Sequence, residues 1–345
     1  MVRKKRVTMA DVAKLAGVSR TTVSFILNNV PDTNIPDATR QRVLQIAREL
    51  NYMPNVQALN LATGKTMMIA LVVRQTSEQM SGDAFAGEFI RGVTGVIEAE
   101  NYHLVIHAAE PDARESTYGK LVRTHKVDGL LISSPLVNDQ EVRLLYREET
   151  PIVLHGATDT QDIPSVDVDN RQGAYMAVRY LIDLGHRRIG HISNAPFSYA
   201  SSSDRLDGYC QALAEAGIPY DESLVLAGEF TASSGYEPMR ALLDLPNPPT
   251  AVFVGSDMVA LGAMEAIRSR GARIPEDISL VGFDDILYAR YTMPPLTTVR
   301  IPAYELGRSA GDLMLKIIRG ESLPGTRILL PTELVVRRST IKCPA

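Results

Sequence analysis

Seven short apolar runs recur from residue 67 onward, separated by segments whose apolar residues have helical spacing. The runs are MMIALVV, YHLVIHA, VDGLLIS, TPIVLHG, RRIGHIS, TAVFVGS and ISLVGFD. Strands that alternate with helices in this way predict parallel sheets with helices on both faces, which is an α/β fold. The alternation restarts around residues 163–169 and continues in a predicted helix over 170–184. We therefore expect two doubly wound subdomains.

The first 65 residues have a different pattern, which predicts three short helices around a small core. Thr8 is placed to cap the first helix, and Ser19 is placed to cap a second helix over 20–27. Gly17 between these helices permits the left-handed backbone of a tight turn. A third helix is predicted over 37–50 from the spacing of its apolar residues. Two short helices joined by a glycine turn indicate a helix-turn-helix.

The outer face of the second helix carries an arginine and short hydroxyl side chains, while its apolar residues face inward. Hydroxyl groups suit contacts with phosphates, and an arginine can reach a base edge in the major groove. The outward residues of this helix are Arg20, Thr21, Thr22 and Ser24.

The formal net charge of −4 is unevenly distributed along the 345 residues. Residues 1–65 hold ten Lys and Arg against four Asp and Glu, a net charge of +6, and the rest carries −10. A basic segment on an acidic body is typical of a protein that binds a polyanion with one end, although a solvated surface is the alternative. The length predicts two or three folding units.

Cys210 and Cys343 are too few for a disulfide framework, and no thiolate metal site is expected. Their small number favours a reducing compartment, so we expect a cytoplasmic protein. The basic residues 1–6 are not followed by the apolar run of a signal peptide. Because no stretch reaches the roughly 18 apolar residues of a membrane span, no membrane partner is expected.

The sequence of the first unit resembles the DNA-binding head of the lactose repressor (LacI/GalR) family. The segments that carry the resemblance are VTMADVAKLAGVSRTTVSFILNN and ATRQRVLQIARELNYMPN. The resemblance implies a head over residues 1–54 and a double-stranded DNA operator as partner. It also implies a hinge helix and linker over 55–66, in which Leu61 wedges into the minor groove with Asn55 and Ala58 nearby. The head residues implied to contact DNA are Thr8, Ser19, Arg20, Thr21, Thr22, Ser24, Asn28 and Tyr52.

Two departures from the family pattern limit what the resemblance implies about base readout. Phe25 stands where an arginine often reads a guanine, and it either contacts a thymine methyl group or joins the helical core. The loop over 30–36 is longer than in the lactose repressor, and Pro36 replaces the usual serine cap of the third helix. Contacts of this loop with DNA are therefore not inferred.

The body, over residues 67–340, resembles the family's effector-binding and dimerisation domain and the periplasmic sugar-binding proteins. The segments that carry the resemblance are GHRRIGHIS, SSDRLDGY, SDMVALGAMEAIR, IPEDISLVGFDD and PPLTTV. It implies two lobes of periplasmic-binding-protein type, between which the chain crosses three times. We expect lobe one to comprise about 67–163 and 292–327, and lobe two about 164–291 and 328–340.

Ligands of open α/β sheets bind beyond the carboxyl ends of the strands, which places a cleft between the lobes. Arg205 in SSDRLDGY matches the family arginine that holds effector oxygens, and a guanidinium offers two fixed donors to vicinal hydroxyls or a carboxylate. Asp284 matches a family aspartate that accepts hydrogen bonds from the effector. The adjacent Asp285 is expected to cap the following turn.

Four further residues complete the predicted effector site. Phe230 corresponds to an aromatic wall, and Ser256 stands where the lactose repressor has a ligand-contacting asparagine. Arg74 and His155 end strands of lobe one, whereas Asp257 is expected to cap the helix that follows it. These groups suit a sugar or oligosaccharide, and a purine or an acidic metabolite could use the same groups.

Alternatives of other classes have weaker support. ATGKT over 62–66 lacks the glycine of a phosphate-binding P-loop, because Leu59 occupies that position. His103 and His107 fall in a predicted strand that separates their side chains, so no metal is expected, and no cofactor or catalytic pair is indicated. A transport-type binding protein would match the body alone. We therefore expect a homodimeric, non-enzymatic regulator whose effector acts as an inducer or, alternatively, as a corepressor.

Overall fold

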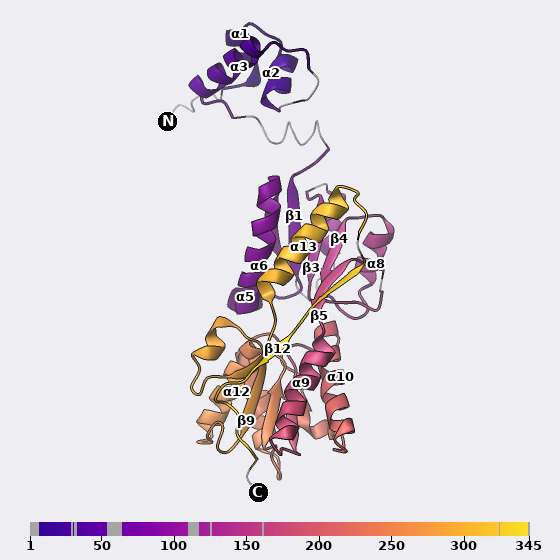
Figure 1. The fold of residues 1–345 in the computed structure, drawn as a ribbon, viewed down its shortest axis with the longest axis vertical. Coiled ribbons are helices and arrows are strands. Elements are labelled where there is room, and N and C mark those ends of the chain that lie inside the picture. Colours follow the sequence, from indigo (N-terminus) through magenta and orange to yellow (C-terminus); the bar gives the residue numbers. More distant parts are fainter. Residues whose placement is uncertain are drawn as a thin grey trace. The chain divides into compact units, whose positions relative to one another are not determined.

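The computed structural model describes residues 7–28, 30, 33–53, 64–109, 117–124, 126–160, 162–323 and 325–343. The chain divides into two compact units, residues 1–66 and 67–345 (Figure 1). Asn55, Ala58 and Leu61, the predicted hinge contacts, lie outside the described residues.

Three helices form the described part of the first unit, and both predicted caps are confirmed. Thr8 and Asp11 form a reciprocal capping box at the start of the first helix, and the Ser19 hydroxyl accepts a hydrogen bond from the Thr22 amide at 3.0 Å. Gly17 ends the first helix with a φ of 66°. The helices are α1 (Met9–Ala16), α2 (Arg20–Leu27) and α3 (Asp37–Glu49).

The core of the first unit is small and consists of the inward apolar faces of the three helices. Phe25 is 39% exposed and is not part of this core. The alternative that Phe25 packs inward is therefore wrong. The buried apolar residues are Val12, Ala13, Ala16, Val23, Ile26, Val43 and Ala47.

The first lobe of the second unit is built on a six-stranded parallel sheet with the order β11-β5-β4-β3-β1-β2. Its strands are β1 (Met68–Val73), β2 (His103–Ala108), β3 (Gly129–Ser133), β4 (Ile152–His155), β5 (Ser165–Val168) and β11 (Arg327–Leu330). Its helices are α5 (Ser77–Gly82), α6 (Ala84–Ile97), α7 (Thr117–Arg123), α8 (Gln140–Arg147) and α13 (Ala303–Ile318).

The β1 strand explains why the apolar runs of this lobe are nearly continuous. Its side chains alternate between two cores: Ile69 and Leu71 pack in the core that contains residues of α6 and α13, while Ala70 and Val72 pack in the core that contains residues of α7 and α8. A central parallel strand is buried on both faces, so neither face requires polar residues.

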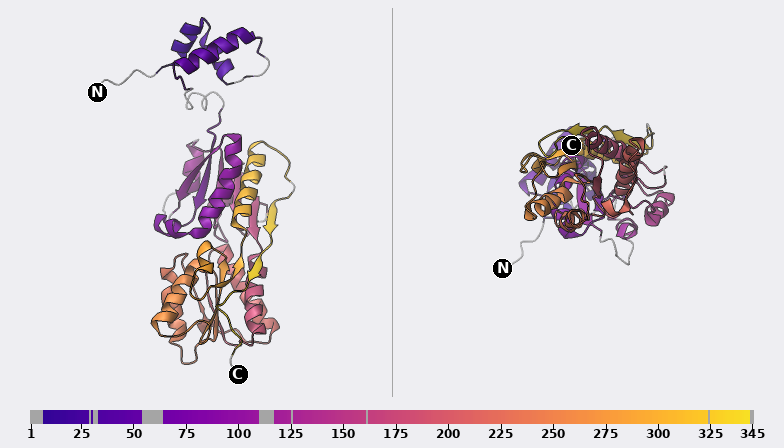
Figure 2. Two further views of the ribbon diagram at one scale, coloured as in Figure 1. Left: turned by 60° about the vertical axis from the view of Figure 1, so that its left-hand side comes forward. Right: turned by 90° about the horizontal axis from the view of Figure 1, so that it is seen from below.

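The second lobe, coloured mainly from pink to orange in Figure 2, has a six-stranded sheet with the order β12-β10-β9-β8-β6-β7. Among its described strands, β12 runs antiparallel to β10, and the other neighbouring strands are parallel. The strands are β6 (Ile189–Ile192), β7 (Val225–Leu226), β8 (Ala251–Val254), β9 (Ser279–Asp284), β10 (Thr297–Arg300) and β12 (Glu333–Val335). The helices are α9 (Asn170–Asp183), α10 (Ala200–Glu215), α11 (Ser233–Leu243) and α12 (Asp257–Ser269).

Sheet pairing corrects the expected limits of the lobes. The β5 strand pairs with β4 and so belongs to lobe one, although we placed residues from 164 onward in lobe two. The β10 strand pairs with β9, so the expected return to lobe one at residue 292 is wrong. The β11 strand pairs with β5, so residues 328–330 belong to lobe one. Apolar runs identify the strands, but hydrogen-bonded neighbours decide which sheet each strand joins.

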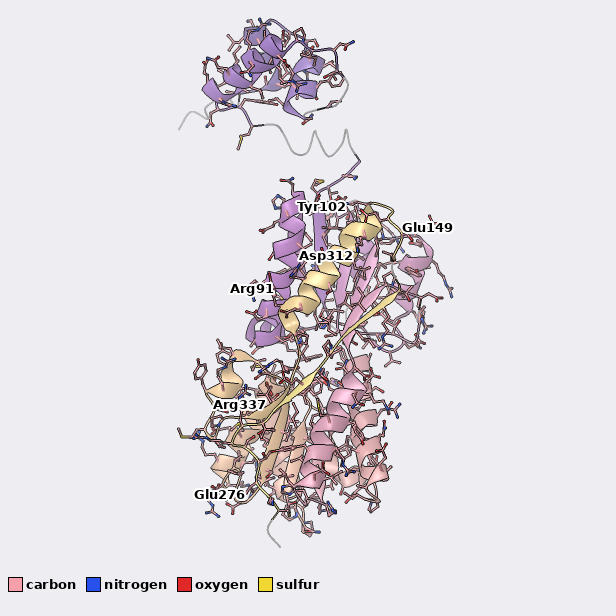
Figure 3. All side chains as sticks on the ribbon, in the orientation of Figure 1. Arg91, Tyr102, Glu149, Glu276, Asp312 and Arg337 are labelled. Carbon is pink, nitrogen blue, oxygen red and sulfur yellow. The ribbon has the colours of Figure 1, made fainter. Side chains whose placement is uncertain are left out.

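Asp285 also differs from its predicted role as a turn cap. Its carboxylate forms ion pairs with Arg300 at 2.8 Å and with Arg337 at 2.5 Å. Arg337 lies in the terminal segment that follows β12 and is labelled in Figure 3. Asp285 therefore fastens the terminal segment to the end of the β9 strand.

A glycine contact holds α6 against α13. A Cβ atom at Gly92 would collide with the backbone carbonyl oxygen of Tyr304 and lie 2.8 Å from the backbone nitrogen of Arg308. A Cβ at Gly95 of the same helix would meet only the Tyr304 hydroxyl, at 3.8 Å. The two glycines therefore differ in packing while sharing one helix.

We expect Gly92→Ala to lower the melting temperature of the protein by several degrees, because the helices must separate at a cost of about 1–3 kcal/mol. Gly95→Ala is the matched control and should leave the melting temperature unchanged or raise it, because alanine favours helix by up to about 1 kcal/mol. Circular dichroism melts of both variants measure this difference. Equal melting temperatures would contradict the assigned helix contact.

Candidate functional site

The outward face of α2 carries the residues predicted to contact nucleic acid. Arg20, Thr21 and Asn28 are exposed, and Asn28 donates to the Ser24 hydroxyl at 3.2 Å. Thr8 and Ser19 are also exposed, at the starts of α1 and α2. Thr22, Ser24 and Tyr52 are half-buried, so they present less surface to a partner.

A cavity lies where strands of both sheets end at their carboxyl termini, as the two-lobed prediction required. The space that the centre of a water molecule can occupy there is about 90 Å³, which corresponds to roughly six to nine waters. This is room for a small molecule. Its polar and aromatic lining includes Gln75, Asp83, Phe85, Phe89, Ser133, His155, Asp167, Asn170, Asn194, Ser201, Arg205, Phe230, Ser256 and Asp284.

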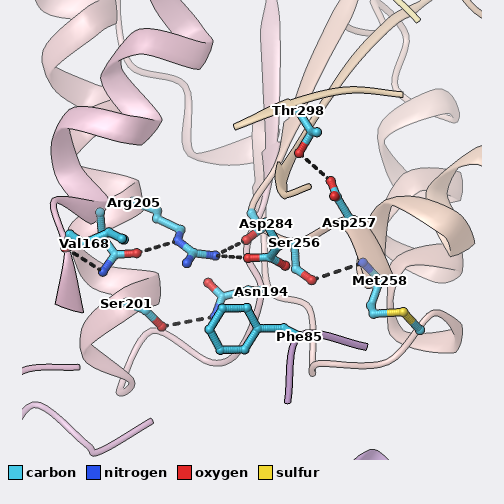
Figure 4. A network of polar contacts seen from close by, with 12 residues as sticks. Phe85, Val168, Asn194, Ser201, Arg205, Ser256, Asp257, Met258, Asp284 and Thr298 are labelled. Carbon is cyan, nitrogen blue, oxygen red and sulfur yellow. Dashed lines mark hydrogen bonds and ion pairs between the residues drawn. The ribbon is translucent and has the colours of Figure 1, made fainter. Parts of the chain in front are cut away.

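Arg205 on α10 is held by contacts on several sides (Figure 4). Its Nε donates to Asn170 Oδ1 at 2.9 Å, and its Nη1 donates to the carbonyl oxygen of Gly255. The guanidinium lies 3.8 Å from the centre of the Phe283 ring, and Nη1 lies 3.7 Å from Asp284 Oδ1. The arginine is therefore fixed in the lining, where its donors are oriented before a ligand arrives.

Asp284 ends the β9 strand with a φ of 117°, a backbone conformation unusual for a residue other than glycine. Burial raises the pKa of Asp284 to about 7, and the carboxylate of Asp83 acts in the same direction. The Arg205 guanidinium opposes this rise in pKa. The structure thus places Arg205 and Asp284 together in the cavity, where a guanidinium lies beside a carboxyl group with a pKa of about 7.

Ser256 lines the cavity as predicted, and it also has the helix-capping role that was expected of Asp257. Ser256 caps α12 by accepting the Met258 amide at 3.2 Å. Asp257 is fully buried and accepts hydrogen bonds from the Thr298 hydroxyl at 2.7 Å and the Ile286 amide at 3.0 Å. The prediction that Asp257 caps the helix is wrong, because its side chain joins α12 to the β10 strand and the segment after β9.

The aromatic part of the lining surrounds His155. Its ring centre lies 5.3 Å from that of Phe85 and 4.6 Å from that of Phe89. Burial lowers the pKa of His155 to about 4, with a smaller contribution from Arg205, so the imidazole is neutral at pH 7. Phe230 also lines the cavity and has a φ of 64°.

Arg74 does not line the cavity, which corrects its predicted place in the effector site. The lining includes Val73 and Gln75, the residues on either side of it. Arg74 Nη1 instead donates to the Tyr118 hydroxyl at 3.1 Å and to Asp139 Oδ2 at 3.4 Å. Successive side chains of an extended segment point to opposite sides, so the prediction was wrong by one residue.

Several polar residues of the lining were not predicted, among them Asp83, Asp167, Asn170 and Asn194. Asp83 caps α6, and Asn170 at the start of α9 joins Arg205 to Asp167, with Asn170 Nδ2 3.1 Å from Asp167 Oδ1. Asn194 accepts a hydrogen bond from Ser202 at 3.0 Å. One signal was available in the sequence: Asp167 interrupts the apolar strand SVDV near its carboxyl end, where ligands bind.

We expect Asp284→Asn to stabilise the protein at pH 8. A carboxyl whose pKa is raised in the folded state contributes stability below its ordinary pKa of 3.8, and this contribution is lost as the pH rises through about 7. Asparagine stays uncharged, so the excess melting temperature of the variant should be largest at pH 8 and shrink towards pH 5. Asp277→Asn is the control, because the Arg273 partner lowers the pKa of Asp277 to about 2. A gain independent of pH would contradict the assignment.

No group of three or more His, Cys, Asp or Glu in the described ranges is placed to hold a metal ion. Among the same residues, no helix is long and apolar enough to cross a membrane. The described features are a helical head with an exposed second helix and a body with a cavity of small-molecule size.

These two features, joined in one chain, define a ligand-responsive DNA-binding regulator. Residues 8–55 match the bacterial regulatory proteins of the lacI family, and residues 178–340 match the periplasmic binding protein-like domain. The chain belongs to the lacI family of bacterial transcriptional regulators.

Similar proteins are regulators over their whole length, in agreement with the expectation of a non-enzymatic protein. The HTH-type transcriptional regulator CelR of Thermobifida fusca is 35% identical, with 98% of this chain and 100% of CelR covered. The HTH-type transcriptional repressor CytR of Escherichia coli (strain K12) is 37% identical, with 98% and 97% covered.

Solved structures give the same result. The CelR-cellobiose complex is 35% identical and has a TM-score of 0.74, with 97% of this chain and 100% of that chain covered. The lac repressor dimer bound to operator and the anti-inducer ONPF is 30% identical and has a TM-score of 0.84, with 98% and 100% covered. The predicted fold class is confirmed.

Proposed function

We propose that this chain is a repressor that leaves a palindromic operator when a sugar or a related small metabolite binds between its lobes. The observation that carries the proposal is the Arg205 and Asp284 pair, held 3.7 Å apart in a cavity of small-molecule size. A guanidinium and a carboxylate side by side can donate to one ligand hydroxyl and accept from the next. The related CelR was solved as a complex with cellobiose, which supports a sugar ligand.

DNA binding is assigned to the head. Arg20 and Thr21 are exposed on α2, the helix that enters the major groove in helix-turn-helix proteins. Asn55, Ala58 and Leu61 remain predicted hinge contacts. Operator binding would place the protein in the cytoplasm, at the nucleoid.

A homodimer is the proposed binding form, since a two-fold symmetric operator is read by two heads. Lobe two exposes a run of large apolar side chains in and after the 3-10 helix over Leu287–Arg290. Leu287 is 59% exposed, Tyr291 is 74% exposed and Met293 is 94% exposed. Such a patch is suited to contact with a second copy, and the lac repressor relative was solved as a dimer.

A DNA-binding titration tests the proposal. Palindromic fragments from the genomic neighbourhood of the coding sequence are titrated with protein at two salt concentrations, and analytical ultracentrifugation gives the oligomeric state. We expect a specific complex at nanomolar protein that weakens as salt rises, formed by a dimer. Failure to form any specific complex up to micromolar protein would contradict the function, and a stable tetramer would contradict the dimer. Tighter DNA binding with ligand would instead identify a corepressor.

A further inference from the structure

The side-chain oxygen of Gln75, a residue of the same cavity lining, has no hydrogen-bond partner among the described residues. Gln75 follows the β1 strand, is 2% exposed and lines the cavity. Its Nε2 donates to Asp83 Oδ2 at 3.2 Å, whereas its Oε1 is buried and has no hydrogen-bond partner among the described residues. Asp83 Oδ1 accepts the backbone amides of Phe85 and Ala86, and Asp83 Oδ2 accepts from Gln75 Nε2, so this carboxyl group orients the Gln75 amide. A buried acceptor without a donor costs about 1–3 kcal/mol, which a ligand N–H or O–H would remove.

The charges of the lining also favour a ligand that donates hydrogen bonds. Asp83, Asp167 and Asp284 supply three carboxyl groups to the cavity, and Arg205 supplies one guanidinium. Arg205 already donates to two protein oxygens and lies beside Asp284. His155 adds no positive charge at pH 7, because burial lowers its pKa to about 4. Burial raises the pKa of all three carboxyl groups, to about 6 for Asp167 and about 7 for Asp284. An anionic ligand would therefore add negative charge to a buried site whose carboxyl groups outnumber its one guanidinium.

We infer that the ligand of this cavity presents several O–H or N–H donors and carries no anionic group, and that Gln75 Oε1 accepts one of its donors. The inference rests on the proposed function, because it assumes that the cavity is the effector site. It narrows the ligand class: neutral sugars remain, whereas sugar phosphates and sugar acids are excluded. Phe85 and Phe230 supply apolar surface for the carbon face of such a ring.

Matched pairs of sugars test the charge requirement on the purified full-length chain. The probes are glucose, galactose, ribose and cellobiose, each compared with its phosphate or its acid form, such as glucose 6-phosphate or glucuronate. Thermal shift and titration calorimetry measure binding, since a ligand that binds the folded state raises its melting temperature. We expect at least one neutral sugar to bind and its anionic counterpart to bind at least tenfold more weakly.

A substitution at Gln75 tests the contact itself. Gln75→Leu removes the unpaired oxygen, and we expect it to weaken the neutral sugar about tenfold. Gln211→Leu is the matched control, because Gln211 is half-buried on α10, does not line the cavity, and bonds Arg171 and Glu215. Operator binding without ligand confirms that both variants are folded.

Three results would overturn the inference: tighter binding of an anionic member, binding by none of the neutral sugars, or unchanged affinity in folded Gln75→Leu. These results are distinct from failure of the proposed function. If an anionic ligand binds and releases DNA, the ligand class is wrong but the repressor function stands. If sugars bind as expected and no specific DNA complex forms, the ligand class stands and the repressor function fails.

Discussion

Arg205→Ala should abolish the response to effector while leaving operator binding without effector intact. The guanidinium is 6% exposed and is the positively charged group of the described cavity lining at pH 7. Each charge-assisted hydrogen bond to a ligand contributes about 1.5–3 kcal/mol, so losing one or two of them weakens binding about 100-fold. Calorimetry with a neutral sugar that stabilises the wild-type chain measures the affinity, and fluorescence anisotropy measures operator binding.

Two further variants separate loss of contact from loss of structure. Arg205→Lys keeps the positive charge but not the two fixed donors, and we expect an intermediate loss of ligand affinity. Arg179→Ala removes an arginine that pairs with Asp183 on the exposed side of α9, and it should bind ligand like the wild type. If folded Arg205→Ala still released DNA at the wild-type ligand concentration, the cavity would not be the effector site.

Arg20→Ala should weaken specific operator binding by about 10-fold to 100-fold, without changing ligand affinity. Arg20 is exposed at the start of α2, where its side chain can form a bidentate contact with a guanine worth about 1–3 kcal/mol. Because a base contact discriminates between sequences, binding to unrelated DNA should weaken much less. Anisotropy titrations with operator and scrambled DNA measure both effects.

Arg42→Ala is the matched control for the head. Arg42 is exposed on α3, away from the predicted reading face, so its removal should reduce operator binding only slightly. Equal losses for the two variants would show that the head contributes general positive charge, and would contradict base reading by Arg20. An equal loss of Arg20→Ala on operator and scrambled DNA would contradict it as well.

Much of the fold was predictable because its local signals agree with its packing. Thr8, Gly17 and Ser19 have the predicted capping and turn roles, since these depend on residues three or four positions away. All seven apolar runs contain strands. Six of these strands are buried and so leave an unambiguous pattern, whereas β2 is largely exposed at the edge of its sheet. Arg205 and Asp284 were found through the family motifs that contain them.

What could not be predicted depends on contacts between distant segments. The hydrogen bonds between β10 and β9 decide which sheet β10 joins. The strand sequence TTVR does not indicate this partner. Asp83 resembles any residue before a helix, and only the fold brings it to the cavity. Arg74 was predicted to line the cavity, but its neighbour Gln75 lines it instead.

The central claim is that one chain couples ligand binding to release of DNA. The most direct test titrates a neutral sugar that stabilises the protein into the preformed complex of full-length protein and operator, with fluorescence anisotropy as the readout. We expect operator affinity to fall at sugar concentrations near the dissociation constant measured by calorimetry, and to stay constant in Arg205→Ala. An operator affinity unchanged at saturating sugar in the wild-type protein would contradict the account.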